Sequence, residues 1–449
     1  MPVAPAACSG SLSAGLLYCD GKKVKILNRL REDADYIINR AIQAVLPDEA
    51  VRRALNGKEF PGRVILLSVG KAAWRMAYSA CEVLKNRIST GIVITKYGHV
   101  QGELPGIRCF EAGHPVPDEN TYAATGKALR MVQELQDSDT VLFLLSGGGS
   151  ALFESPLVSA DELQGITGQL LACGADIVEI NTVRKRLSAV KGGRFALHCA
   201  PAHVFSIILS DIVGDPVDMI ASGPACPDSS SSTQALAVAE KYKLTLSDEA
   251  RTLLQQETPK TLDNSSWKIT GSVRELCIAA AQACRELGYE PEILTDTEQG
   301  EARQVGAFLG RAAAQMADTK TPKAIIIGGE TVVKLTGKGK GGRNQELALS
   351  AAGQIAGLPN VLVLSLGSDG TDGPTDAAGG IVDGGTVGRL SAVGLYVEDI
   401  LSDNDAYHGL EAAGDLIITG PTGTNVNDVA LALIRPAVGK SAEKYTQII

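Results

Sequence analysis

The chain has 449 residues, of which 45% are hydrophobic and 21% charged, and its formal net charge is −9. This composition is typical of a globular protein with two or three domains and excludes a disordered chain. The acidic balance argues against a nucleic-acid binder, and no apolar run approaches the roughly 18 residues that a membrane span needs. Nine cysteines without metal-ligand spacing indicate reduced thiols in a cytoplasmic enzyme.

Strands and helices alternate along the chain from residue 29 onward. Residues 1–28 lack the basic start of a signal peptide, and we expect an extension there that could be disordered. In the first half we expect helices at 29–46, 71–85, 118–135, 160–173 and 176–187, and strands at 63–69, 91–95, 140–145 and 204–209. In the second half we expect helices at 234–243, 247–256, 273–287 and 301–317, and strands at 290–294, 323–327, 331–335 and 360–366.

The strands are apolar runs without period-two alternation, which is typical of strands buried on both faces. We therefore expect an α/β fold with mostly parallel sheets. The turn-rich segment 225–233 suggests a domain boundary, so the predicted domains are 29–228 and 229–449. The last residues could return to the first domain.

Unusual loops repeatedly follow the carboxyl ends of apolar strands. Lys71 follows one strand, Asp211 another, and Glu330 and Asp369 follow two strands of the second half. In open parallel sheets, ligands bind in the crevice outside these strand ends. Small residues alone are explained by tight turns, but the charged residues beside them are not.

The segment LLSGGGSALF at 144–153 is one of these loops. It does not match the nucleophile elbow G-x-S-x-G, because the last glycine is missing around Ser150 and the first is missing around Ser146. Gly147, Gly148 and Gly149 would allow backbone amides to converge on an anion, so a phosphate cradle and a plain turn both remain open.

A second glycine-rich segment, GKGKGGRNQE at 337–346, matches G-x-G-x-x-G before a predicted helix that runs to about residue 356. Lys338, Lys340 and Arg343 make it too basic for a nicotinamide site, and no acidic residue ends a strand about 20 residues further on. The pattern suits a polyphosphate, and a charged hairpin tip is the alternative.

Acidic residues form two further candidate groups. Asp211 directly follows a buried strand, which is a costly place for a carboxylate unless it is paired or functional. Asp369, Asp372 and Asp376 could hold a hydrated magnesium ion, although Asp and Gly also dominate ordinary turns. The metal ligands remain unknown at this stage.

Basic residues gather at 181–193, where Arg184, Ser188 and Lys191 fall on one helical face. This face could bind an anionic substrate or could simply be solvated. His114, in GHPVPD, is as compatible with a structural role as with a functional one. No histidine completes a nucleophile–base pattern.

The chain thus offers cations, glycine-rich loops and carboxylates without an obvious nucleophile. Phosphoryl transfer needs this set, because its catalysis depends mainly on positioning and charge neutralisation. No Walker motif and no protein-kinase motif set is present, so the residues indicate a small-molecule kinase on another scaffold.

Seven ordered motifs resemble those of the class II glycerate kinases, also called glycerate 2-kinases, whose second half carries the MOFRL region. The resemblance covers residues 30 to 436, and its motifs are SVGKAA, TKYGH with GHPVPDEN, LLSGGGSAL, NTVRKRLSAVKGGR, LSDIVGDPVDMIASGPACPD, GGETVVKLTGKGKGGRNQELAL and SDGTDGPTDAAGG. It implies a Rossmann-like larger domain, a second α/β domain and an active site in the cleft between them.

The resemblance also implies Mg²⁺-dependent transfer of the γ-phosphoryl group of ATP to D-glycerate, giving 2-phosphoglycerate. It implies catalytic roles for Lys71, Asp211 and Arg343. The predicted substrate- or nucleotide-binding residues are Ser146, Gly147, Gly148, Gly149, Ser150, Arg184, Lys191, Glu330, Asn344, Asp369 and Asp372. Because members have been labelled hydroxypyruvate reductases, an NAD(P)H-dependent hydroxypyruvate reductase is the rival function. We expect small-molecule partners only, no nucleic acid or membrane, and a possible homodimer.

Overall fold

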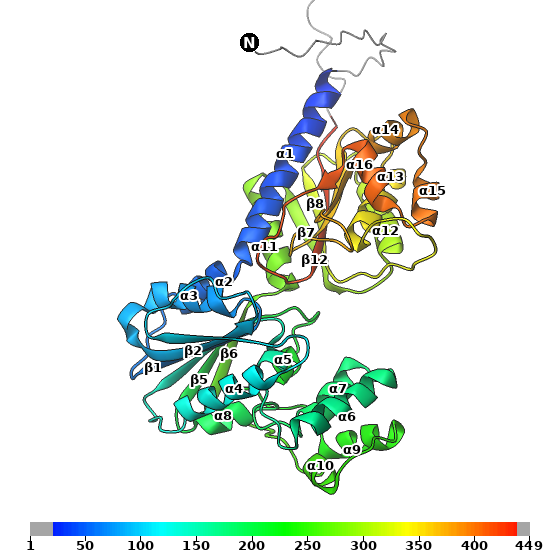
Figure 1. Cartoon of the computed structure of the whole chain (residues 1–449). Coiled ribbons are helices and arrows are strands. Elements are labelled where there is room, and N and C mark those ends of the chain that lie inside the picture. The colour runs from blue at the N-terminus through cyan, green and yellow to red at the C-terminus, as the bar shows by residue number, and fades with distance from the viewer. Residues whose placement is uncertain (1–20, 438–449) are drawn as a thin grey trace, which may run out of the picture.

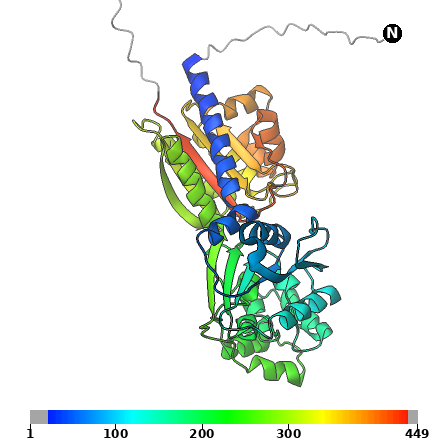
Figure 2. The same ribbon diagram turned by 90° about the vertical axis from the view of Figure 1, so that its left-hand side faces the viewer.

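A computed structural model describes residues 21–437, in which two α/β domains are stacked end to end (Figures 1 and 2). Each domain contains one six-stranded sheet. The prediction of a disordered extension falls mostly on residues 1–20, which lie outside the described residues. Within residues 21–437, no helix combines the length and the apolar character that crossing a bilayer requires.

The first sheet has the order β3-β2-β1-β4-β5-β6, and every neighbouring pair is parallel. Its strands are β1 (Val64–Val69), β2 (Ile88–Lys96), β3 (Ile107–Ala112), β4 (Thr140–Leu145), β5 (His203–Leu209) and β6 (Ser265–Gly271). All residues of β1 and β4 are buried, as the apolar runs predicted. The strand order is that of a Rossmann fold, and it reverses between β1 and β4, where such folds bind ligands.

Helices cover both faces of this sheet. The helices α2 (Pro47–Leu55) and α3 (Ala73–Leu84) pack on one face, whereas α4 (Glu119–Met131), α5 (Gly149–Leu152) and α8 (Arg194–Cys199) pack on the other. Short 3₁₀ turns are present at Lys85–Arg87 and Ile220–Ser222. This two-sided burial explains why the strands are apolar throughout.

The helices α6 (Ala160–Ala172), α7 (Ile177–Arg184), α9 (Ser232–Lys241) and α10 (Asp248–Leu254) form a small lobe beside the first domain (Figure 1). They share an apolar core of their own, which includes Leu163, Val183 and Leu254. Residues 225–233, which read as a linker, therefore join two parts of the first domain.

The second sheet has the order β11-β10-β9-β12-β8-β7. Its strands are β7 (Glu290–Glu298), β8 (Lys323–Gly329), β9 (Val361–Gly367), β10 (Gly379–Asp383), β11 (Leu416–Ile417) and β12 (Asp428–Ile434). The β7–β8 pair is parallel, and the other neighbouring pairs are antiparallel. This sheet is thus mixed, because β12 inserts between β8 and β9 in the opposite direction.

Helices also cover both faces of the second sheet. The helices α1 (Gly21–Ala44) and α11 (Val273–Glu286) pack on one face. The other face is covered by α12 (Ala302–Gln315), α13 (Arg343–Gln354), α14 (Thr386–Ala392), α15 (Val397–Ser402) and α16 (Ala406–Ala413). Figure 1 shows α1 as the long helix that runs along the second domain.

The sheets divide the chain differently from the boundary expected at residue 228/229. Strand β6 pairs with β5, so the first sheet extends to residue 271. Helix α1 packs on the second domain, where Arg31 bonds Asp415 at 2.7 Å and Arg435 bonds Asp33 at 2.6 Å. The expected strand at 331–335 is also wrong. Apart from a single bridge at Val332 this segment is a loop, in which Thr331 is buried and Val332 and Leu335 are exposed.

Candidate active site

Two cavities between the domains adjoin a third cavity that is lined by the second domain alone, and the three together are called the groove. The lysine cavity, of about 360 Å³, is lined by residues of both domains, including Lys71 and Asn425. The acidic chamber, of about 180 Å³, adjoins it and shares Asp211. The outer cavity, of about 750 Å³, shares Arg343 with the chamber, and Asp369 lines all three. The groove therefore brings together the three predicted catalytic residues, Lys71, Asp211 and Arg343.

The turn after β1 and the glycine loop (residues 146–149) are bonded to each other at the point where the strand order reverses. The Lys71 amide donates to the Gly147 carbonyl at 2.9 Å, and the Ala72 amide donates to Ser146 Oγ at 3.0 Å. Gly70 has a φ of +122°, and a Cβ there would lie 2.3 Å from Ser146 Oγ. Ser146 is buried, so its hydroxyl serves to fix the turn that carries Lys71.

The glycine loop keeps two backbone amides unused by other protein groups. Within residues 21–437, neither Gly147 N nor Gly148 N donates a hydrogen bond, whereas the Gly149 amide donates to the Ser146 carbonyl at 3.3 Å. Gly148 has a φ of +86°, a conformation that favours glycine. An anion cradle requires amides of this kind.

Asp211 lies against the glycine loop at the end of β5. A Cβ at position 147 would lie 2.4 Å from Asp211 Oδ2, so only glycine leaves room for this carboxylate. Burial raises the pKa of the Asp211 carboxyl, and the nearby charge of Lys71 acts in the opposite direction. Because it lines both the lysine cavity and the acidic chamber, this carboxylate can meet a ligand in either.

Arg343 is the first residue of α13 and enters the acidic chamber from the second domain. Its Nε donates to Asp428 Oδ2 at 2.6 Å and its Nη1 donates to Glu330 Oε1 at 2.9 Å. Burial raises the pKa of Asp428 to about 6, although its bond to Arg343 acts to lower it. The guanidinium is thus held by two carboxylates at the edge of the groove.

The first four amides of the second glycine loop (residues 337–342) are bonded within the second domain. Within residues 21–437 Gly341 N and Gly342 N donate no hydrogen bond, and both residues line the outer cavity. Gly337 N donates to Asn404 Oδ1 at 2.9 Å, and Lys338 N donates to Asp403 Oδ1 at 3.0 Å. The Gly339 amide donates to the Asp403 carbonyl at 2.7 Å. A Cβ at position 337 would lie 2.2 Å from Asp403 Cα, so the glycine there serves close packing. The amides of residues 337–340 are therefore not free to form the polyphosphate cradle suggested by this motif, and for Gly341 and Gly342 the cradle stays a prediction.

The start of α13 is likewise occupied by a protein group. Asp372 accepts hydrogen bonds from Asn344 N at 3.1 Å and from Gln345 N at 2.9 Å. The Asn344 side chain is buried and accepts from Ser365 Oγ at 2.6 Å. Asp372 lines the outer cavity, but its carboxylate acts as the cap of this helix.

The three candidate magnesium ligands lie in different settings. Asp372 caps α13, and Asp376 accepts a hydrogen bond from Tyr407 Oη at 2.8 Å. Asp369 accepts from Thr371 N at 2.9 Å and lines all three cavities. Among residues 21–437, no group of three or more His, Cys, Asp or Glu side chains is arranged to hold a metal ion by itself.

Ser150, Arg184 and Lys191 turn inward and line none of the three cavities. The Ser150 carbonyl accepts from Lys191 Nζ at 2.7 Å and from Arg184 Nη2 at 3.3 Å. Glu154 pairs with both cations, at 3.4 Å and 3.2 Å respectively. Ser150 Oγ lies 2.5 Å from Ser222 Oγ. These residues fix the α5 turn behind the glycine loop, outside the groove.

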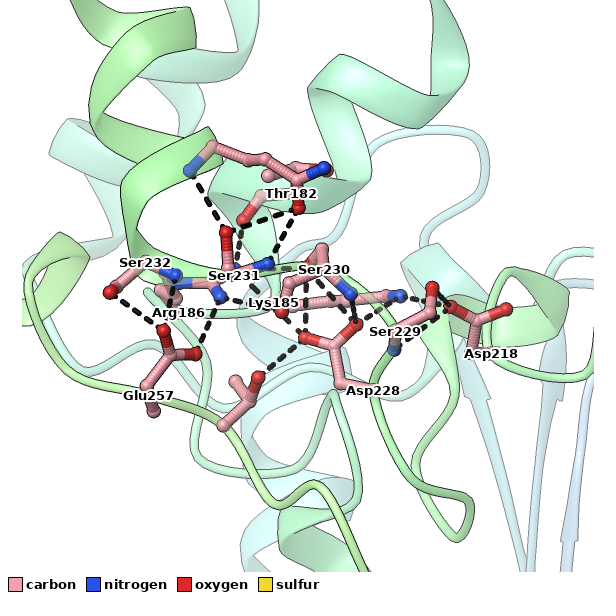
Figure 3. Close-up of polar contacts among 12 residues, drawn as sticks. Thr182, Lys185, Arg186, Asp218, Asp228, Ser229, Ser230, Ser231, Ser232 and Glu257 are labelled. Atoms are coloured by element: carbon pink, nitrogen blue, oxygen red, sulfur yellow. Dashed lines mark hydrogen bonds and ion pairs between the residues drawn. The ribbon is translucent and has the colours of Figure 1, made fainter.

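Figure 3 shows the polar contacts that the neighbouring cations of the same segment, Lys185 and Arg186, make with other residues of the domain. Lys185 and Arg186 have fully buried side chains. Lys185 Nζ bonds Asp228 Oδ1 at 2.8 Å and Asp218 Oδ2 at 3.2 Å, and Arg186 bonds Glu257 at 3.3 Å. The basic segment is therefore neither a solvated face nor a ligand site, because its charges are neutralised inside the domain.

His114, which the sequence left without a role, lies beside Gly148 of the glycine loop. It follows β3, and a Cβ at position 148 would lie 3.0 Å from His114 Nε2 and 3.3 Å from Lys71 Cγ. His99 bonds the Lys71 carbonyl at 3.0 Å from the neighbouring strand end. The missing signal was β3 itself: once Ile107–Ala112 is seen as a strand, His114 occupies another strand-end loop.

Two protein-family models match the chain. A domain of unknown function, DUF4147, matches residues 33–255, and the MOFRL family matches residues 323–428. The D-glycerate 2-kinase of Thermotoga maritima is 51% identical over 411 residues, which are 90% of this chain and 98% of that protein. A crystal structure of a glycerate kinase from T. maritima, also 51% identical, has a TM-score of 0.86 and matches 91% of this chain and all of its own.

Two further relatives differ from each other in name: one is a glycerate 2-kinase and the other a putative hydroxypyruvate reductase. The glycerate 2-kinase of Pyrococcus horikoshii is 38% identical over 440 residues, 92% of this chain and 99% of that protein. A protein of Agrobacterium vitis named as a putative hydroxypyruvate reductase is 38% identical over 391 residues, 83% of this chain and 87% of its own length.

The fold and the groove define a two-domain α/β enzyme with a ligand site at the strand ends of a Rossmann-like sheet. Its second domain is the MOFRL region. The chain belongs to the glycerate 2-kinase family.

Proposed function

We propose that this chain transfers the γ-phosphoryl group of ATP to a hydroxyl of D-glycerate, giving 2-phosphoglycerate and ADP. The observation that carries the proposal is the meeting of Asp211 and Arg343 in one small chamber, with Lys71 in the cavity beside it. A carboxylate base and two cations are the groups that phosphoryl transfer to an alcohol requires. Two similar kinases, 51% and 38% identical in sequence, act by their names on glycerate.

In this mechanism Asp211 orients the attacking hydroxyl and accepts its proton. Its burial beside the glycine loop, which raises its pKa, favours a proton acceptor over a permanent ion pair. Lys71 neutralises the carboxylate of the acceptor. Arg343 stabilises the charge that develops on the transferring phosphoryl group, and Asp428 and Glu330 hold its guanidinium in place.

Magnesium forms part of the proposal because the acidic chamber fits it. The chamber is lined almost entirely by oxygen-bearing side chains, namely Asp211, Glu330, Ser368, Asp369, Asn425, Asn427 and Asp428, with Arg343 as its cation. Mg²⁺ commonly binds through one or two carboxylates together with substrate phosphates. Asp369 would hold the ion, which supplies charge neutralisation for the triphosphate. A homodimer and a cytoplasmic location stay predictions.

A coupled assay tests the proposal. Purified protein is mixed with ATP, D-glycerate and Mg²⁺, and ADP release is followed while the product is identified by ³¹P NMR. We expect glycerate-dependent ADP release, a 2-phosphoglycerate signal and loss of both with EDTA. A parallel assay with NADH and hydroxypyruvate tests the reductase function. Oxidation of NADH without ADP release would overturn the kinase proposal.

A further inference from the structure

Asn427 lies where the second sheet meets the acidic chamber. It directly precedes β12, and because β12 runs antiparallel to β8 and β9, its first residues meet the carboxyl ends of those two strands. Asp428, the first residue of β12, pairs in register with Gly329 and with Gly367. Asn427 is therefore placed between the ends of β8 and β9, and it lines the chamber.

The backbone at Asn427 is held in a conformation that few residues adopt. Its φ is +65°, in the left-handed region. The Asn427 carbonyl accepts from Ser368 N at 3.0 Å, and the Val426 amide donates to Ser368 Oγ at 2.8 Å. Residues other than glycine are uncommon in this region, and strained backbone of this kind clusters at functional sites.

The side chain of Asn427 has an unused hydrogen-bond donor. Asn427 is 5% exposed, and within residues 21–437 its Nδ2 has no hydrogen-bond partner. Ten buried side-chain nitrogen and oxygen atoms of this part of the chain lack a partner, and only this one belongs to a residue that lines the groove. Asn404, which is also buried and has a φ of +55°, instead donates from Nδ2 to Glu346 Oε2 at 3.0 Å. A buried donor without a partner destabilises a fold, so a ligand that accepts from it is favoured.

The acidic chamber offers many acceptors and few donors. It is lined by one guanidinium, that of Arg343, and by four carboxylates, which belong to Asp211, Glu330, Asp369 and Asp428. Arg343 already donates from Nε and Nη2 to Asp428 and from Nη1 to Glu330. A phosphoryl group beside Arg343 therefore gains charge neutralisation from it, while the amide of the adjoining Asn427 is an uncommitted donor for the phosphoryl oxygens.

We propose that Asn427 is a further catalytic residue, whose Nδ2 donates a hydrogen bond to an oxygen of the phosphoryl group during its transfer. This inference rests on the proposed kinase function and adds a group that none of the candidate site residues includes. In the step, the bond from the γ-phosphorus to the oxygen of ADP breaks, a bond to the glycerate hydroxyl oxygen forms, and the hydroxyl proton passes to Asp211. The amide keeps its protons throughout and acts only as a donor to developing charge.

Kinetics of two full-length variants test this role. Asn427→Gly removes the side chain and suits the positive φ, and Asn427→Asp keeps the size but loses the donor. We expect kcat to fall about 10²- to 10³-fold in both, with the KM values for ATP and D-glycerate within about threefold of wild type. The melting temperature of Asn427→Gly should change little, because this side-chain donor has no partner in residues 21–437.

Asn360→Asp is the matched control. Asn360 is buried at the opposite end of β9, and its Nδ2 donates to the carbonyls of Ala317 and Arg435 at 2.8 Å and 2.7 Å. This variant should lose stability and keep its kcat. A normal kcat in Asn427→Gly would overturn the proposal. A normal kcat in Asn427→Asp would also overturn it, since the residue would then act through its oxygen, as a ligand of the cation.

A binding measurement gives a readout that does not depend on turnover. Calorimetry compares Mg·ADP alone with Mg·ADP and aluminium fluoride, which imitates the phosphoryl group in transfer, both with D-glycerate present. We expect aluminium fluoride to tighten binding to wild type, and Asn427→Gly to lose about 10- to 100-fold of this gain while its Kd for Mg·ADP stays within about twofold. An equal gain in both proteins would overturn the role of Asn427. A wild type without ADP release in the kinase assay would instead overturn the proposed function, and the same titration would still decide whether Asn427 binds a phosphoryl group.

Discussion

The two glycine-rich loops look alike in sequence and play opposite parts in the structure. The glycine loop at 146–149 leaves the amides of Gly147 and Gly148 unused and lies between Lys71 and Asp211. The second glycine loop at 337–342 donates the amides of residues 337–340 to Asp403, Asn404 and Asp405. The first loop therefore leaves its central amides unused, whereas the second bonds its first four amides within its own domain and, within residues 21–437, leaves only those of Gly341 and Gly342 unused.

This difference shows that glycine content does not by itself identify an anion site. At Gly337 the glycine is needed because another backbone is 2.2 Å from the Cβ position, whereas at Gly147 a carboxylate is 2.4 Å from it. At Gly337 the close contact is with the backbone of Asp403, which belongs to the packing of the domain. At Gly147 it is with the side chain of Asp211, a candidate catalytic residue. Changes in the two loops should accordingly separate into effects on stability and effects on rate.

The largest effect is expected at Arg343, the side chain that the second glycine loop delivers to the groove. Arg343→Ala removes the guanidinium from the acidic chamber and leaves Glu330 and Asp428 without their cation. We expect kcat to fall about 10²- to 10⁴-fold, as for loss of a group that stabilises transition-state charge. Steady-state kinetics measure the fall in kcat, and Arg311→Ala, at an exposed arginine, is the control. A near-normal kcat would exclude a catalytic role for Arg343.

The next effect is expected in the glycine loop. Gly147→Ala places a methyl group where Asp211 Oδ2 now lies, so the carboxylate must move. We expect kcat to fall about 10²- to 10³-fold, because a displacement of about 1 Å can cost that much. The melting temperature should change little. Gly165→Ala in α6, where the added methyl meets nothing within 4 Å, is the control. Equal kcat values in the two variants would contradict this assignment.

The buried pair of Lys191 and Glu154 behind the glycine loop should make the stability of the protein depend on pH. Burial lowers the pKa of Lys191 to about 8, with Glu154 and Arg184 as its charged neighbours. Between pH 8 and 10.5 the unfolded chain keeps the proton that the folded chain loses, so the free energy of unfolding should rise by about 3 kcal/mol. Lys191→Met combined with Glu154→Gln removes both charges and should abolish this rise. Urea unfolding across this pH range measures the difference, and parallel curves for the two proteins would refute it.

The sequence predicted the α/β class, most of the helices and the groove at the strand ends, because these follow from apolar patterning and from strand–turn–helix order. It missed β3 and β6, which are partly exposed and lack a continuous apolar run, and it also missed β10, β11 and β12, although β12 is apolar and fully buried. The sequence could not predict the direction in which a side chain points. Lys191 reads as a surface cation, but the carbonyls of Ser150 and Phe153 hold it in the interior. Such contacts join residues about 40 positions apart, and no local pattern records them.

The smallest effect on kcat is expected in the second glycine loop, where a substitution should change stability instead of rate. Gly337→Ala would push this loop away from Asp403, because the new Cβ would lie 2.2 Å from a backbone atom that cannot move freely. We expect the free energy of unfolding to fall by about 1–3 kcal/mol, the usual cost of overpacking, while kcat stays within about threefold. Gly353→Ala, at an exposed site in α13 with nothing within 4 Å, should instead stabilise by about 0.5–1 kcal/mol. A Gly337→Ala protein of normal stability with a strongly reduced kcat would mean that this loop meets the nucleotide after all.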